Sequence, residues 1–194
     1  MKNAPLFIRE KIRRGEISGS FEGSVLLADI SGFTSRFDKM AVLGTEGAEL
    51  LSREVSNTLS AVVEISAGFG GFPVSFAGDA VTVVFPEAMK NAQSACELIN
   101  ELNSPDILPL KSQVGKGQVI WDAIPMDGWT FYSFQGSAVR HAAMAYQGCS
   151  VKQPALSGED DESTPFSSVE QPAECFTSPD LFTHSTVNEF RQVI

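Results

Sequence analysis

The sequence predicts an α+β fold in which helices pack on a largely antiparallel β-sheet. Apolar runs of strand length are mixed with amphipathic helical segments along the 194 residues. Two of the runs, Phe72–Ala77 and Ala80–Phe85, are separated only by Gly78 and Asp79, a pair that suits a tight hairpin turn. Because a hairpin joins antiparallel strands, a purely parallel sheet is disfavoured. With 43% apolar residues, the chain can bury a substantial core.

The N-terminal half begins with a helix and a first strand. Leu6–Arg14 has the pattern of a short amphipathic helix that ends at Gly15, and the next residues, 16–23 (EISGSFEG), indicate a flexible linker. Ser24–Ala28 is a continuous apolar run, as in a buried central strand. From Gly44 to Gly68, apolar residues recur every three or four positions, which predicts a long helix.

The second half continues the mixture of helices and strands. The pattern predicts a helix at Ala88–Leu102 and then a strand within Leu108–Trp121. A second strand is expected at Trp129–Phe134, followed by an alanine-rich helix at Ser137–Tyr146. Five aromatic residues are concentrated in these strands and suit either a buried strand or a dimer face: Trp121, Trp129, Phe131, Tyr132 and Phe134.

A change in composition marks the C-terminal part of the chain. Lys152–Pro172 is polar and acidic and contains prolines, so we expect a loop or a disordered insertion there. Apolar character returns at Ala173–Phe182, where we expect a last strand and turn, and Val187–Ile194 suits a frayed helix or linker. The sequence therefore divides into an N-terminal helix and linker over residues 1–20 and one domain over 21–194, with an acidic insertion at about 152–172.

The net negative charge of the chain argues against two classes of binding partner, nucleic acids and anionic membranes. The net charge is −10 and the isoelectric point is about 4.6, so the chain lacks the basic surface that binds nucleic-acid phosphates or an anionic membrane. No apolar run approaches the ~18 residues of a membrane span, and the N-terminus shows no signal peptide. The three cysteines are far apart, which predicts neither a disulfide framework nor a zinc site. We therefore expect a cytoplasmic protein with no nucleic-acid and no membrane partner.

One carboxylate stands at the end of the first apolar strand. Asp29 follows VLLA at 25–28, where a carboxylate without a compensating charge is costly to bury. Taken alone, Asp29 could be a helix cap and Asp79 a turn residue. If the hairpin lies beside the first strand, however, the two carboxylates stand close together. Neighbouring carboxylates repel unless a cation lies between them.

The residues after Asp29 have the character of an anion-binding helix start. Backbone amides in the first turn of a helix bind phosphates. Four residues are placed to present such amides: Ser31, Gly32, Phe33 and Thr34. Hard oxygen ligands beside a phosphate cradle favour magnesium or manganese. The residues alone therefore indicate a metal-dependent phosphate site.

The two aspartate motifs belong to a longer pattern. VLLADISGFT at 25–34 is followed by GAELL at 47–51, GG at 70–71 and FAGDAVTVVF at 76–85. This pattern resembles the catalytic domain of class III adenylyl and guanylyl cyclases, and it is most similar to the bacterial and bicarbonate-responsive soluble adenylyl cyclases. The resemblance is dense from about residue 20 to 86 and extends to about 148. It implies a ferredoxin-like cyclase fold whose domains pair head to tail, with the active sites in their interface.

The resemblance assigns roles to the residues already singled out. It makes Asp29 and Asp79 the metal-binding aspartates, with the carbonyl of Ile30 as a further ligand and the amides of residues 31–34 around the triphosphate. It implies two magnesium or manganese ions, which activate the ribose 3'-hydroxyl so that its oxygen displaces pyrophosphate in line. The expected ligand is a nucleoside triphosphate, with ATP expected first.

Four other positions depart from the family pattern. Serine stands at both positions that would read the purine, Ser75 and Ser133, so ATP and GTP are not distinguished. Arg140 and Met144 stand where the family has an asparagine that orients the ribose and an arginine that stabilises the transition state. Methionine cannot donate a hydrogen bond to a developing charge, and losing one such donor costs ~100-fold or more in rate. Arg140 could contact the triphosphate across the interface as a compensating cation, or it could be a surface arginine.

Two functions remain open on the sequence. In the first, the domain is the metal-bearing half of a two-domain site that forms a cyclic nucleotide, weak or inactive alone, with a second cyclase-like domain or a second copy as partner. In the second, it is a degenerate cyclase homology domain that binds nucleotide or bicarbonate, or that docks to and regulates another module. The presence of both Asp29 and Asp79 favours the first function, since random loss damages these positions as readily as the others.

Overall fold

The computed structural model describes residues 4–86, 89–148 and 156–157. Its elements are, in order, α1 (Leu6–Arg13), β1 (Ser18–Ile30), α2 (Phe33–Ala41), α3 (Gly44–Gly68), β2 (Phe72–Ala77), β3 (Ala80–Phe85), α4 (Met89–Glu101), β4 (Leu110–Pro125), β5 (Thr130–Gln135), α5 (Ser137–Gly148) and β6 (Leu156–Ser157). Most of the acidic insertion, and the elements expected at 173–182 and 187–194, lie outside the described residues.

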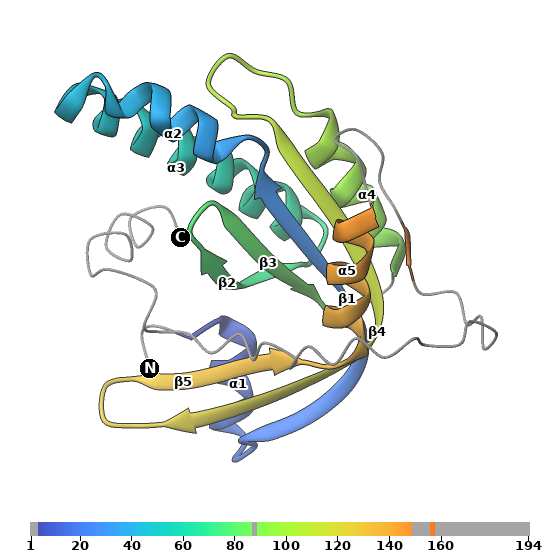
Figure 1. The fold of residues 1–194 in the computed structure, drawn as a ribbon. Coiled ribbons are helices and arrows are strands. Elements are labelled where there is room, and N and C mark those ends of the chain that lie inside the picture. Colours follow the sequence, from blue (N-terminus) through green and yellow to red (C-terminus); the bar gives the residue numbers. More distant parts are fainter. Residues whose placement is uncertain (1–3, 87–88, 149–155, 158–194) are drawn as a thin grey trace, which may run out of the picture.

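The strands form one sheet, which is antiparallel apart from a short addition. The order is β2-β3-β1-β4-β5, with every neighbouring pair antiparallel, and the two-residue β6 joins β4 in parallel. The succession β1-α3-β2 and β3-α4-β4 is the ferredoxin-like arrangement of two interleaved units. The predicted α+β class with a mostly antiparallel sheet is therefore confirmed (Figure 1).

The predicted hairpin is present and connects β2 to β3. Ala77 in β2 is opposite Ala80 in β3, so Gly78 and Asp79 form a two-residue turn. Gly78 has a φ of 64°, a left-handed conformation that suits glycine. Because β3 also pairs with β1, the turn lies beside the C-terminal end of β1.

The prediction of a flexible linker over residues 16–23 is wrong for most of that segment. β1 begins at Ser18, because residues 18–23 continue the pairing with β4. A glycine is required within this stretch: a Cβ on Gly19 would lie 2.9 Å from Nε1 of Trp121, whose indole covers the strand there. The small residues that suggested a linker are thus fitted to a bulky neighbour on the adjacent strand, which local sequence does not reveal.

Each face of the sheet is covered by a different pair of helices. α3 and α4 cover one face, where Leu59 and Ile99 are fully buried against β1 and β3. α1 and α5 cover the other face, where Ile8 and Ala142 pack with Trp121. Successive residues of β1 face opposite layers, so Asp29 points to the same layer as α5.

α5 lies unusually close to the sheet. A Cβ on Gly115 in β4 would lie 2.1 Å from the backbone nitrogen of Ala142 and 2.3 Å from the carbonyl oxygen of Ala138. Only glycine in the strand and small residues in the helix permit this contact. The close packing brings the C-terminal turn of α5 to the end of β1.

Candidate metal and phosphate site

The structure brings Asp29 and Asp79 together. Asp29 stands near the end of β1, directly opposite Ala80, and Asp79 occupies the hairpin turn just before Ala80. The amide of Ile30 donates a hydrogen bond of 3.2 Å to the carbonyl oxygen of Asp79, which ties the turn to β1. The expectation that the hairpin places the two carboxylates side by side is confirmed.

The electrostatics of this pair favour a bound cation. Partial burial, followed by the charge of Asp29, raises the pKa of Asp79 above its usual range. Among the described residues no cluster of three or more His, Cys, Asp or Glu side chains is found, so these two carboxylates lack a third side-chain ligand of that kind. Such a pair of oxygen donors fits magnesium or manganese, which commonly bind one or two carboxylates and complete their shell with water and substrate phosphates.

The predicted phosphate cradle needs one correction. The amide of Ser31 donates a hydrogen bond of 2.7 Å to the carbonyl oxygen of Pro109, so it is not available to a phosphate. Gly32 precedes α2 with a φ of 75° and makes no side-chain cap. The amides of Phe33 and Thr34 stand in the first turn of α2, where a helix provides no acceptor of its own. The predicted cradle is therefore reduced to the amides of residues 32–34.

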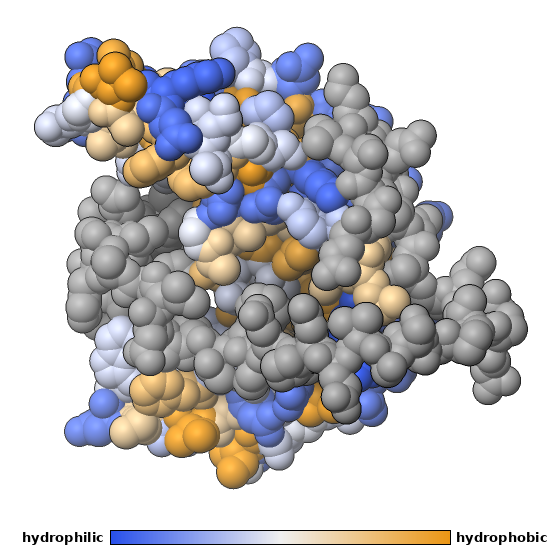
Figure 2. Space-filling view, viewed as in Figure 1, coloured by the Kyte–Doolittle hydropathy of each residue, from blue (hydrophilic) through white to orange (hydrophobic). Residues whose placement is uncertain are grey.

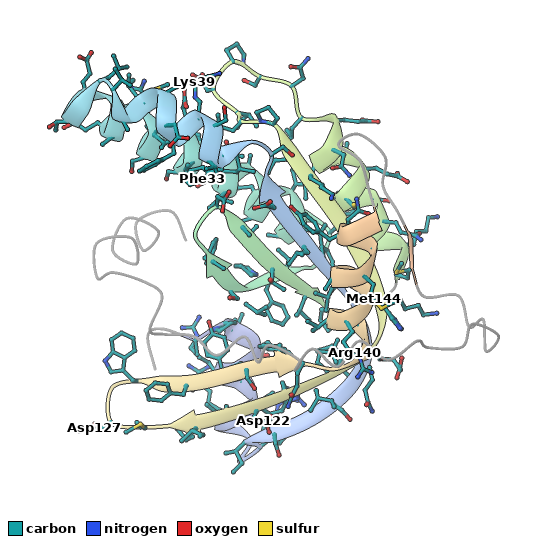
Figure 3. The ribbon with its side chains drawn as sticks, viewed as in Figure 1. Phe33, Lys39, Asp122, Asp127, Arg140 and Met144 are labelled. Carbon is teal, nitrogen blue, oxygen red and sulfur yellow. The ribbon has the colours of Figure 1, made fainter. Side chains whose placement is uncertain are left out.

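Two contacts hold the start of α2 in place. The Phe33 side chain packs against the core on the α3 and α4 side of the sheet, although no residue of α2 is itself buried. The Arg36 guanidinium makes two hydrogen bonds to the Glu54 carboxylate on α3, one of them 3.0 Å from Nε to Oε2. Phe33 lies at the end of α2 nearer the sheet and Lys39 toward the projecting tip (Figure 3).

Two further residues reach the aspartate pair and were missed in the sequence. The Tyr146 hydroxyl on α5 donates a hydrogen bond of 2.5 Å to Oδ2 of Asp29. Lys111 in β4 is opposite Asp29, and its Nζ donates a hydrogen bond of 2.5 Å to the Tyr146 carbonyl while lying 4.0 Å from the centre of the Tyr146 ring. Burial, and then the bond to Asp29, raise the pKa of Tyr146. The only sequence signals were a tyrosine in an alanine-rich helix and a lysine early in a strand.

The two predicted purine-reading positions meet at a separate pocket. Ser75 of β2 and Ser133 of β5 line it together with Tyr132 and apolar neighbours, and no charged side chain takes part. Its enclosed volume is about 10 Å³, room for a single water molecule. The described chain alone therefore offers no space for a purine at this point.

Arg140 and Met144 both lie on α5 (Figure 3). Met144 is 54% exposed, and Arg140, also exposed, borders an open cavity of about 260 Å³ beside Gln118 and Gln135. Arg140 precedes Tyr146 by six residues, about 9 Å along the helix axis. The structure does not bring Arg140 to the aspartates of its own chain, so its predicted contact with a triphosphate requires the site of a partner.

Comparison with curated proteins gives a partial match. No family model matches the chain. Adenylate cyclase type 10 of rat, rabbit and mouse is 33% identical to it over 81 residues, which is 41% of this chain. The chain spans only 5% of the length of those relatives.

Comparison with solved structures identifies the fold. A bacterial light-regulated adenylyl cyclase matches with a TM-score of 0.57 and 20% identity over 75% of this chain and 46% of its own. The catalytic core of a rhodopsin-guanylyl cyclase with converted specificity, in complex with ATPαS, matches with 0.57 and 16% identity over 72% and 79%. The dimeric guanylyl cyclase domain of a fusion protein from Blastocladiella emersonii matches with 0.58 and 16% identity over 72% and 81%. The fold is that of a class III adenylyl/guanylyl cyclase catalytic domain.

The described residues contain no helix that is long and apolar enough to cross a membrane.

Proposed function

We propose that this domain is the metal-bearing half of a two-domain nucleotidyl cyclase site, which forms a cyclic nucleotide from a nucleoside triphosphate. The observation that carries the proposal is the meeting of Asp29 and Asp79 beside the open N-terminus of α2. The local match to adenylate cyclase type 10 and the cyclase fold support it. The neighbours of known structure favour a nucleoside triphosphate, and ATP is the first candidate.

In this function, different residues of the chain would bind the metal ions and the triphosphate. Asp29 and Asp79, with the carbonyl of Ile30, would hold two magnesium or manganese ions, and the amides of residues 32–34 would bind triphosphate oxygens that complete the metal shell. When bound, the metals supply activation of the 3'-hydroxyl and neutralisation of the phosphates. The hydrogen bond from Ile30 to the Asp79 carbonyl and the anchor of Phe33 keep carboxylates and amides at a fixed separation.

A partner domain is needed because the described residues do not supply the rest of the chemistry. Neither Ser75 nor Ser133 carries a charge, and a serine hydroxyl both donates and accepts, so neither position selects adenine over guanine. Met144 cannot stabilise a developing charge. The partner would supply base recognition and the transition-state cation, and Arg140 would contact the triphosphate in the partner's site.

Exposed apolar side chains support association with such a partner. Two groups are visible in Figure 2, at the tip joining α2 to α3 and along the β4–β5 hairpin. The first contains Val42 and Leu43, 86% and 55% exposed, and the second contains Ile124, Met126 and Phe131, 64%, 57% and 39% exposed. Of the aromatic residues weighed for a dimer face, Trp129 and Phe131 are exposed whereas Trp121 and Phe134 are buried. Apolar surface of this kind is typical of interaction sites.

Calorimetric titration with manganese and a non-cyclisable ATP analogue tests the proposal. We expect the wild-type domain to bind and Asp79→Ala to bind at least ~100-fold more weakly, because loss of one of two carboxylate ligands costs more than the roughly 10–100-fold that is lost with an outer-shell partner. Asp127→Ala is the matched control, since Asp127 is an exposed aspartate at the tip of the β4–β5 hairpin (Figure 3). Equal binding by all three proteins would exclude a metal role for Asp79.

The degenerate cyclase homology domain is the alternative outcome of the same experiment. If none of the proteins binds at millimolar ligand, with or without a complementary cyclase domain, the chain is a docking or regulatory module. If wild type binds in an Asp79-dependent way but never supports turnover when complemented, it is a nucleotide-binding module.

A further inference from the structure

The Tyr146 side chain on α5 is hydrogen-bonded to one of the two aspartates, Asp29. The bond to Oδ2 of Asp29 is 2.5 Å long and joins residues 117 positions apart in the chain. Neither the cyclase resemblance nor the proposed metal chemistry assigns a role to this tyrosine. Its position nevertheless couples α5 to the carboxylate on which metal binding depends.

The hydrogen bond restricts the Asp29 carboxylate. The last torsion of an aspartate joins an sp³ to an sp² carbon, so the carboxylate rotates over a broad range when nothing holds it. An ionised carboxylate offers two oxygens and about four lone-pair sites. Tyr146 occupies one site on Oδ2 and leaves Oδ1 and the remaining lone pair of Oδ2 for a cation shared with Asp79.

Tyr146 is itself held from two sides. The Nζ of Lys111 donates to the Tyr146 carbonyl and lies 4.0 Å from the centre of its ring, within the range of a cation–π contact. Behind it, the close contact of Gly115 with Ala142 and Ala138 fixes α5 on the sheet. The hydroxyl is therefore directed at Asp29 by packing that does not depend on a bound metal.

We propose that Tyr146 is a positioning residue of the metal site: its hydroxyl orients the Asp29 carboxylate for a divalent cation and stays bonded to it when the cation is bound. This inference rests on the proposed function, since it requires Asp29 to be a metal ligand. Outer-shell hydrogen bonds of this kind orient ligating carboxylates, and their loss typically weakens metal binding 10–100-fold. A residue that only joined α5 to β1, or one that the cation displaced, would act differently.

The test is calorimetric titration with a preformed manganese–tripolyphosphate complex, a probe without a base that does not involve the Ser75 and Ser133 pocket. The proteins are wild type, Asp79→Ala, Tyr146→Phe and Tyr132→Phe. The chain contains two tyrosines, so Tyr132→Phe is the matched control: it removes the same hydroxyl from a residue that packs against Phe134 on β5. Tyr146→Phe keeps the ring that packs beside Lys111, and a thermal melt without metal verifies that it folds.

We expect Tyr146→Phe to weaken binding of the complex by about tenfold and Tyr132→Phe to change it by less than about twofold. Binding by Tyr146→Phe that equals or exceeds that of wild type overturns the positioning role. If wild type binds and Asp79→Ala does not, the proposed function stands whatever Tyr146→Phe does. If wild type and Asp79→Ala bind alike, the proposed function fails, and the role of Tyr146 fails with it.

A spectroscopic readout separates orientation from displacement. In the Tyr132→Phe protein, Tyr146 is the only tyrosine, so tyrosine bands in the ultraviolet resonance Raman spectrum report its hydroxyl alone. We expect these bands to show a hydroxyl donating to a carboxylate both before and after addition of manganese–tripolyphosphate. Loss of the donor signature on binding would show that the cation displaces Tyr146 and would overturn the proposal.

Discussion

The two ends of the candidate site lie on one face of the sheet but differ in chemistry. At one end, Asp29 and Asp79 stand beside the first-turn amides of α2, with Tyr146 bonded to Asp29. At the other end, Ser75 and Ser133 line a pocket that has no charge and room for one water. In the proposed function, one end would bind a metal and a triphosphate, whereas the other end lacks the groups that select a base. The difference leads us to expect that this chain binds the charged part of a nucleotide and that a partner supplies the rest.

The largest expected effect comes from supplying the missing end. A complementary cyclase domain that has a purine-reading lysine and a transition-state arginine, but lacks its own metal aspartates, should raise cyclic-nucleotide formation at least ~100-fold over this domain alone. The measurement is product formed by the mixture under saturating nucleotide and manganese. The same mixture made with Asp29→Asn is the control and should be silent. Activity no higher than that of the separate domains would contradict the proposal that this domain is one half of a two-domain site.

A second, smaller effect is expected at the phosphate cradle. Gly32 has a φ of 75° and a Cβ there would meet no atom within 4 Å, so Gly32→Ala introduces backbone strain without a clash. We expect a loss of about 1–2 kcal/mol of unfolding free energy and weaker binding of manganese–tripolyphosphate.

Gly128→Ala is the matched control for that variant. Gly128 has a φ of 80°, is equally open, and lies in the β4–β5 connection. It should lose similar stability in chemical denaturation and keep its affinity for the complex. If both variants bind as wild type does, the amides of residues 32–34 do not hold the triphosphate.

The partial burial of Asp79 and its repulsion by Asp29 predict a stability effect that solvent screening limits to about 1 kcal/mol. Without metal at neutral pH, Asp79→Asn should melt about 2–4 °C above wild type, because it removes a charge whose pKa is raised by burial and by Asp29. A carboxyl with a raised folded-state pKa destabilises the protein above that pKa and is relieved as the pH falls through it. The difference in melting temperature should therefore shrink on acidification. Asp127→Asn, an exposed control, should show no such difference.

The smallest effect is expected at the base end. Ser75→Ala and Ser133→Ala should leave the affinity for manganese–tripolyphosphate within about twofold of wild type and stability within about 0.5 kcal/mol, since the probe carries no base and the pocket contains no charged side chain. Titration and thermal melts of the two variants provide the measurement. A large loss of affinity for this base-free probe would show that the two ends of the site are energetically coupled. It would contradict the view that they act independently.

Much of the metal end could be predicted from the sequence. The apolar run before Asp29 and the Gly78-Asp79 turn are local patterns, and together they predicted the hairpin and the pairing of the carboxylates. The prediction failed at residues 18–23, which form part of β1 and not a linker. Gly19 is small because it packs against Trp121, a residue far away in the sequence. The prediction failed again at Ser31, whose amide bonds to Pro109 in a segment that approaches only in the folded chain.

The sequence by itself determined which chemical groups this protein has: two carboxylates at strand and turn ends, a helix start after the first, and serine, arginine and methionine at the remaining family positions. Local periodicity and turn preference are properties of neighbouring residues, so they can be recognised along the chain. Only the tertiary structure decided which amides remain free and that Tyr146, held by Lys111, reaches Asp29. Those contacts depend on the register of β1 against β4 and on the close packing of α5 at Gly115, which join residues far apart in sequence.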